Sequence, residues 1–161
     1  RVFFEPGRLI AGNAGLLVTR VIRVKPGVSR SFVIVDAAMN DLLRPALYDA
    51  QHTVQPLIQP TSSAKLHMVE VVGPICETGD TFGQPRLMPL SAAGSLLAIR
   101  TAGAYGAVMA STYNARPLVP EVMVKGADFS VIRNRVTVDD MLARERLPVW
   151  LNDHGNTHRK V

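Results

Sequence analysis

The sequence has 161 residues, enough for about one domain with its own core, and its apolar share of 47% and charged share of 19% are typical of globular proteins. No run approaches the roughly 18 uncharged apolar residues of a transmembrane helix, so we expect no membrane association. The net charge of +5 comes mostly from singly scattered basic residues, which argues against nucleic-acid binding, and the lone cysteine, which excludes an internal disulfide, favours the cytoplasm.

The chain begins with an apolar run, Val2-Phe3-Phe4, that ends at Glu5-Pro6-Gly7-Arg8. A continuous apolar run of this kind is typical of a strand buried on both faces of a parallel sheet, and residues 9–15 predict a short helix weakened by glycine. We therefore expect residues 1–15 to be the remnant of a preceding domain, and the segment shows no signal-peptide pattern.

Short β-rich runs separated by turn residues follow, and this spacing predicts a sandwich or barrel over residues 16–148, with a loose tail over residues 149–161. The predicted strands cover residues 17–25, 31–36, 53–58, 65–72, 96–101, 105–113 and 118–124.

Two short helices are also expected. Residues 40–48 predict one or two helical turns, with Asn40 or Asp41 as cap and Pro45 restricting any longer helix. The spacing of Thr137 and Asp140 predicts a capping box that opens a second short helix.

A glycine-rich loop over residues 73–83 holds the lone cysteine, Cys76, beside Glu77. Gly73 and Gly79 allow backbone angles that other residues resist, so this loop can bring a thiol and a carboxylate against a ligand. In isolation, such a cysteine is more often a small buried apolar residue beside a solvated loop.

Further segments accompany this loop: Leu43-Arg44-Pro45-Ala46-Leu47-Tyr48, Gly103-Ala104-Tyr105-Gly106, and Ser111-Thr112-Tyr113-Asn114-Ala115-Arg116-Pro117. With Glu5-Pro6-Gly7-Arg8 and Cys76-Glu77-Thr78-Gly79-Asp80, they resemble the C-terminal part of the diaminopimelate decarboxylases, pyridoxal-phosphate enzymes of bacterial lysine biosynthesis in the alanine-racemase-like group. The resemblance runs from about Val2 to about Arg146.

This resemblance implies a mainly β domain with short helices, a Greek-key-like barrel or sandwich that forms the C-terminal domain of a fold-type III pyridoxal-phosphate enzyme. It implies an N-terminal α/β barrel that is absent from this chain, of which residues 1–15 would be the last strand and helix. That barrel would carry the lysine that holds pyridoxal 5′-phosphate as a Schiff base, so we expect this chain alone to be inactive.

The resemblance also implies the cofactor-binding residues. Glu5 would lie against the pyridine nitrogen and keep the ring protonated, and Gly7 would offer its backbone N–H to an anion. The guanidinium of Arg8 suits either the cofactor phosphate or a substrate carboxylate, and both assignments stay open. Tyr105 would contact both cofactor phosphate and substrate; a strand aromatic in the core is the alternative.

For meso-diaminopimelate, the resemblance implies that Arg44 and Tyr48 line the substrate pocket, where an arginine suits a substrate with a carboxylate at each end, and Glu77 suits the distal ammonium. Cys76 would donate the proton that replaces carbon dioxide, and L-lysine would be the product. The family's loop exchange implies a homodimer in which Cys76 and Glu77 serve the partner subunit's site. Tyr113, Asn114 and Arg116 match the family pattern and are expected to be structural.

No metal site is expected, because the four histidines, His52, His67, His154 and His158, are widely dispersed. Two alternatives stay open: a related basic amino-acid decarboxylase of the same group, and a non-catalytic dimerisation or regulatory homologue. Arg44 together with Glu77 argues against a substrate with a bare distal amine, since the pair fits a zwitterionic end.

Overall fold

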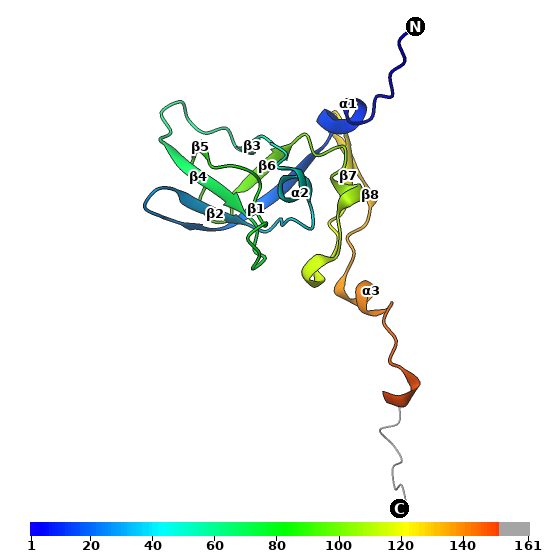
Figure 1. Ribbon diagram of the computed structural model, residues 1–161. Helices are drawn as coiled ribbons and strands as arrows, with labels where there is room; N and C mark the ends of the chain where they lie inside the picture. Colours follow the sequence, from blue (N-terminus) through cyan, green and yellow to red (C-terminus); the bar gives the residue numbers. More distant parts are fainter. Residues whose placement is uncertain (152–161) are drawn as a thin grey trace, which may run out of the picture. The chain divides into compact units, whose positions relative to one another are not determined.

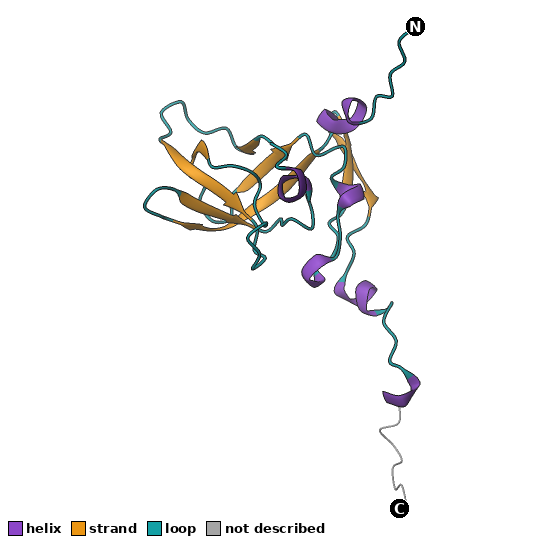
Figure 2. Cartoon of the chain, in the orientation of Figure 1, coloured by secondary structure: helices purple, strands orange, loops and turns teal. Residues whose placement is uncertain are grey.

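The structure is a computed structural model that describes residues 1–151 (Figures 1 and 2). The chain divides into two compact units, Arg1–Ala115 and Arg116–Val161. Residues 152–161 of the predicted tail, with His154 and His158, lie outside the described residues. Among those that are described, no helix has the length and apolar character needed to cross a bilayer.

The first unit is built on one six-stranded sheet with the order β3-β6-β1-β2-β4-β5. Its strands are β1 (Leu16–Lys25), β2 (Ser31–Val35), β3 (Val54–Pro56), β4 (Leu66–Val72), β5 (Arg86–Pro89) and β6 (Leu96–Arg100). Neighbours pair antiparallel except β2 and β4, which are parallel. Figure 1 shows the long β1 between β6 and β2, in a strongly twisted, nearly closed sheet, which confirms the predicted mainly β, barrel-like fold.

The core lies on one face of this sheet, because the strands alternate between buried and more exposed side chains. Its fully buried members are mostly β-branched or aliphatic, as expected for a sheet interior. They include Val21, Val33, Val35, Leu42, Val69, Val71, Phe82, Leu97 and Ile99.

The helices of the first unit are short. They are α1 (Arg8–Ala11), α2 (Arg44–Tyr48) and three 3₁₀ turns, Gly12–Ala14, Ala107–Met109 and Tyr113–Ala115. The helix predicted within residues 40–48 is confirmed as α2, but the predicted caps are wrong: the N-cap is Leu43, without a side-chain hydrogen bond. Asn40 and Asp41 are buried in the preceding turn, where Asp41 accepts a hydrogen bond from the Ala38 amide.

The second unit contains a hairpin of β7 (Glu121–Lys125) and β8 (Asp128–Arg133), whose turn places Gly126 at a φ of 62°. An ion pair between Glu121 and Arg133 joins the open ends of these strands. Beyond the hairpin lie α3 (Val138–Leu142) and a 3₁₀ turn over Val149–Leu151. The capping box at Thr137 and Asp140 is confirmed.

Two strand predictions differ from the structure. Residues 105–113 form turns instead of a strand, because Tyr105 takes a φ of 60° and the chain then closes into the Ala107–Met109 turn. Val2, Phe3 and Phe4 form no strand and are 78–86% exposed, since no neighbouring strand pairs with them in the described chain. The domain boundaries at residues 15 and 148 stay a prediction.

Candidate active site

The loop between β4 and β5 holds Cys76 and Glu77 at the surface. The amide of Gly73 donates to the Asp80 carbonyl (2.9 Å), and the Asp80 amide donates to the Glu77 carbonyl (3.0 Å), so the chain folds back tightly. The Ile75 side chain is buried, whereas Cys76 and Glu77 are exposed. The tight turn therefore anchors the loop from inside and presents the thiol and the carboxylate outward.

The carboxylate of Asp80 organises this loop. Its Oδ2 accepts a hydrogen bond from the Ile75 amide (2.8 Å), next to Cys76, and its Oδ1 accepts one from the Met39 amide (2.7 Å). Gly73 packs directly on the carboxylate, because a Cβ at that position would lie 2.2 Å from Oδ2. The Asp80 side chain, which is 3% exposed, thus ties the cysteine loop to the segment before α2.

A third segment, which ends the first unit, is joined to the same place. Ser111 exchanges two hydrogen bonds with Asn40: its amide donates to the Asn40 carbonyl (2.9 Å), and its carbonyl accepts from Asn40 Nδ2 (3.1 Å). Tyr113 then donates a long hydrogen bond from its hydroxyl to Glu77 Oε2 (3.4 Å). Tyr113, expected to be structural, therefore contacts a predicted substrate residue.

Arg44 lies between two of the predicted pocket tyrosines. Its guanidinium carbon is 5.4 Å from the Tyr48 ring centroid and 5.3 Å from that of Tyr105. One turn of helix separates Arg44 from Tyr48, whereas Tyr105 arrives from a distant loop. Nε of Arg44 is buried without a hydrogen-bond partner, so a polar donor remains for a ligand.

The backbone of Gly7 lies close to the hydroxyl of Tyr105. A Cβ at Gly7 would lie 3.0 Å from the Tyr105 hydroxyl oxygen, so a larger residue would push that hydroxyl away. Tyr105 itself has a φ of 60°, a conformation that costs a non-glycine residue about 1–3 kcal/mol and that persists where the surroundings impose it.

The predicted residues thus fall into two groups in the structure. Gly7, Arg44, Tyr48 and Tyr105 come together in one cluster, from segments that are far apart in the sequence. Cys76 and Glu77 lie in a separate loop, where the Tyr113 hydroxyl from another segment contacts Glu77. Glu5 and Arg8 flank Gly7 with exposed side chains.

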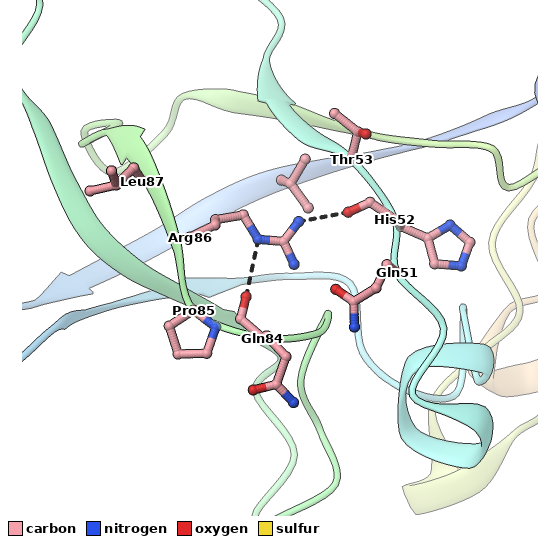
Figure 3. A pocket seen from close by; sticks show the side chains of 8 residues that line it. Gln51, His52, Thr53, Gln84, Pro85, Arg86 and Leu87 are labelled. Carbon is pink, nitrogen blue, oxygen red and sulfur yellow. Dashed lines mark hydrogen bonds between the residues drawn. The ribbon is translucent and has the colours of Figure 1, made fainter.

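Of two pockets in the described chain, one lies beside these groups of residues and the other does not. One of about 240 Å³ opens beside the Glu77 partner and is lined by Met39, Asn40, Leu43, Ser111 and Tyr113. Another, of about 380 Å³, lies between the edges of the sheet and contains none of the predicted site residues (Figure 3). The candidate active site is therefore an exposed surface of loops and α2, not an enclosed cavity within residues 1–151.

Several contacts were not predicted from the sequence. Asp80 belongs to the quoted motif, but the two amides that it accepts from are 5 and 41 residues away, and no local pattern encodes the second. The link between Asn40 and Ser111 spans 71 residues. In the sequence, Asp80, Asn40 and Ser111 are recognisable only as polar residues next to a glycine or an apolar run, a pattern that is common in ordinary turns.

Comparison with known proteins identifies the family of the chain. The family described as pyridoxal-dependent decarboxylase, C-terminal sheet domain, matches residues 9–103. The chain is 50% identical to the diaminopimelate decarboxylase of Zymomonas mobilis over 151 residues, 94% of this chain and 35% of that protein. It is 52% identical to the enzyme of Neisseria meningitidis serogroup A, over 90% of this chain and 35% of that protein.

Among solved structures, the diaminopimelate decarboxylase of Helicobacter pylori in complex with L-lysine matches with a TM-score of 0.78 and 41% identity. The match covers 86% of this chain and 34% of that one. The chain thus spans about a third of the length of the relatives that it matches. On its sequence and its sheet, the chain belongs to the pyridoxal-dependent decarboxylases and contains their C-terminal sheet domain.

Proposed function

We propose that this chain is the C-terminal domain of a diaminopimelate decarboxylase, which uses pyridoxal 5′-phosphate to convert meso-diaminopimelate to L-lysine and carbon dioxide. The observation that carries the proposal is the cluster of Gly7, Arg44, Tyr48 and Tyr105, since residues expected at cofactor and substrate meet there from three segments. Relatives that bear this name match over about 90% of the chain.

The residues present fit the cofactor. Gly7 has no side chain and lies close to the Tyr105 hydroxyl, so its backbone is uncovered at a place where an anion can bind. Nε of Arg44, which has no hydrogen-bond partner, belongs to the same cluster. Gly7 and Tyr105 would hold the phosphate, with Arg8 at the phosphate or at a substrate carboxylate, and Glu5 would lie against the pyridine nitrogen. When bound, pyridoxal phosphate supplies the electron sink for decarboxylation.

The substrate has an amino-acid group at each end. Residues of both the Arg44 cluster and the Cys76 loop suit its distal end. Arg44, with Tyr48 beside it, would bind the distal carboxylate, because a guanidinium forms two parallel hydrogen bonds with a carboxylate. Glu77 would bind the distal ammonium, and the Tyr113 hydroxyl would orient its carboxylate. A substrate without that ammonium would leave Glu77 unpaired.

Cys76 would donate a proton to the carbon that loses carbon dioxide. Cys76 is exposed on a loop that the buried Asp80 carboxylate anchors by hydrogen bonds. This position suits a thiol that acts on a group outside its own subunit. We therefore place Cys76 and Glu77 in the active site of the partner subunit of a homodimer. The cytoplasmic location stays a prediction that rests on the single cysteine.

A subunit-mixing experiment tests this arrangement in the enzyme that joins this chain to its α/β barrel. Cys76→Ala subunits are mixed with subunits in which the cofactor-binding lysine of the barrel is replaced by alanine, and carbon dioxide release is measured. Heterodimers should regain activity, because one of their two sites then has both the lysine and the thiol. The proposal fails if the mixture stays as inactive as its parents after subunit exchange has been confirmed by mass spectrometry.

The matched control mixes wild-type subunits with subunits that carry both replacements. If Cys76 serves the partner's site, neither site of this heterodimer is complete, so activity should fall below the value set by the amount of wild-type protein. If the cysteine served its own subunit, the wild-type subunit would stay active.

A further inference from the structure

The two edge strands of the sheet, β3 and β5, are joined by one side chain instead of a strand ladder. Arg86 opens β5, and its Nη1 donates to the His52 carbonyl (2.6 Å), two residues before β3 begins. Figure 3 shows the guanidinium extending from β5 toward the His52 backbone across the pocket between the edges.

The same guanidinium also holds the base of the cysteine loop. Nη2 donates to the Phe82 carbonyl (2.6 Å), and Nε donates to the Gln84 carbonyl (3.3 Å). We call Arg86 with these three carbonyls the Arg86 clasp. Arginine suits it because a planar guanidinium can address several acceptors at once, whereas a lysine ammonium is a single compact donor group.

The environment strengthens these hydrogen bonds. Arg86 is partly buried, and this burial lowers the pKa of its guanidinium below the ordinary value, because desolvation penalises the charged form. Its described hydrogen bonds all go to main-chain carbonyls. Charge-assisted hydrogen bonds to a partly desolvated cation are stronger than neutral ones, so the clasp resists opening.

On one side, the clasp leads to Cys76. Phe82 is buried, and its amide pairs with the Val71 carbonyl (2.9 Å), which closes the loop that carries Cys76 and Glu77. The carbonyl of the same Phe82 is the one that Arg86 holds. The clasp therefore fixes the point where this loop re-enters the sheet.

On the other side, the clasp leads to Tyr105. The buried His52 donates from Nδ1 to the Arg100 carbonyl (2.9 Å), and the Arg100 amide donates to the Thr53 carbonyl (2.8 Å). Arg100 ends β6, and Thr101 then takes a φ of 62°, which turns the chain toward Tyr105. His52 also closely follows α2, which carries Arg44.

We propose that Arg86 is a positioning residue for the reaction: through the Arg86 clasp it fixes the base of the loop that carries Cys76 and Glu77 against the other edge of the sheet. This inference rests on the proposed function, which places that loop in the partner subunit's site. The clasp joins main-chain carbonyls at the two edges, and its loss removes no apolar side chain from the core, so the loop should shift without unfolding of the sheet.

Cys76, the lone cysteine of the chain, allows a direct test through a nitroxide spin label. The label's mobility is measured by electron paramagnetic resonance in the 161-residue chain and in Arg86→Met and Arg86→Lys. Both variants should show a more mobile label, with a circular dichroism spectrum like that of the parent. Arg86→Lys keeps the charge and most of the volume, so it remains informative if Arg86→Met does not fold.

The matched control is Arg30→Met, which removes a partly exposed ion pair with Glu70 (2.5 Å) on the same sheet. This control removes an arginine elsewhere in the first unit and should leave the label's mobility unchanged. An unchanged label in both Arg86 variants, or an equal increase in the control, would overturn the positioning role.

In the complete enzyme, Arg86→Lys should lower kcat roughly 10- to 100-fold because Cys76 is misplaced, and it should also raise KM because Glu77, assigned to substrate binding, moves with the same loop. A KM effect alone would overturn the inference. The two proposals fail separately: if Cys76→Ala leaves kcat unchanged, the role of the thiol is wrong, whereas the label measurement still reports on the clasp.

Discussion

At the scale of single residues, Gly73 shows how tightly the cysteine loop is packed. In Gly73→Ala the new Cβ would lie 2.2–2.5 Å from the Asp80 carboxylate, so Asp80 must leave its hydrogen bonds to the Met39 and Ile75 amides. We expect a loss of about 1–3 kcal/mol in the free energy of unfolding, measured by urea denaturation.

Gly79→Ala is the control from the same loop. A Cβ there has its nearest neighbours at 3.8 Å, which is ordinary van der Waals contact, so stability should change little. Equal losses in the two variants would show that glycine itself, rather than the Asp80 packing, accounts for the effect.

Cys76 and Glu77 are adjacent, but replacing each of them should affect different kinetic constants of the complete enzyme. Cys76→Ala removes the proposed proton donor without removing a charge, so kcat should fall roughly 10²–10⁴-fold with little change in KM. Glu77→Gln removes the proposed partner of the distal ammonium and should weaken substrate binding by about 1–3 kcal/mol. Steady-state kinetics with meso-diaminopimelate separate the two, and a Cys76→Ala variant that changes KM alone would contradict the assignment.

Motif residues could be found from the sequence because their types and spacing are unusual together, as with Cys76 beside Glu77 or Arg44 one helical turn before Tyr48. The residues that hold them in place could not. Arg86 bonds to a carbonyl 34 residues away, and nothing in its neighbours distinguishes it from the many single arginines of the chain. Tertiary hydrogen bonds to main-chain atoms leave no periodic signal in a sequence.

At the scale of elements, α3 depends on its capping box. The Thr137 side chain and backbone donate to Asp140, which lowers the pKa of that carboxyl below its ordinary value of 3.8. A depressed folded-state pKa means that the cap is fully present above the unfolded-state pKa and is lost as the pH falls through the folded-state value.

An NMR titration of the Asp140 carboxyl should therefore give a midpoint below 3.8. In Thr137→Val the hydroxyl donor is absent, so the midpoint should rise toward the ordinary value. An unchanged Asp140 midpoint in Thr137→Val would contradict the cap.

Most strands of the sheet could be predicted because apolar runs alternate with turn residues, as in β1, β2 and β4. Neither β5 nor β8 was among the predicted strands. β5 has only four residues, begins with Arg86 and ends in proline, so it lacks the run of β-branched residues that predicts a strand. Residues 105–113 have a strand-like composition, but the positive φ of Tyr105 and the hydrogen bonds of Ser111 to Asn40 impose turns.

At the scale of the whole molecule, the site within this chain is incomplete for catalysis. Lys25, Lys65, Lys125 and Lys160 do not lie in the lysine motif of the family. We therefore expect the purified 161-residue chain with added pyridoxal phosphate to release no carbon dioxide from meso-diaminopimelate above a cofactor-only control. Release above that control, measured with carboxyl-labelled substrate, would show that the chain catalyses the reaction without a barrel.

The parallel pairing of β2 with β4 has a consequence for folding kinetics. Parallel neighbours need a long crossover, and here the connection between Val35 and Leu66 includes α2 and also β3, which pairs at the opposite edge of the sheet. Pairing of this kind requires the chain to lose the entropy of closing a long loop before the stabilising contacts form. The chain should therefore fold slowly for its size, over milliseconds to seconds. A substitution in α2, such as one at Arg44, can therefore lower the yield of folded protein through the crossover as well as alter the substrate site.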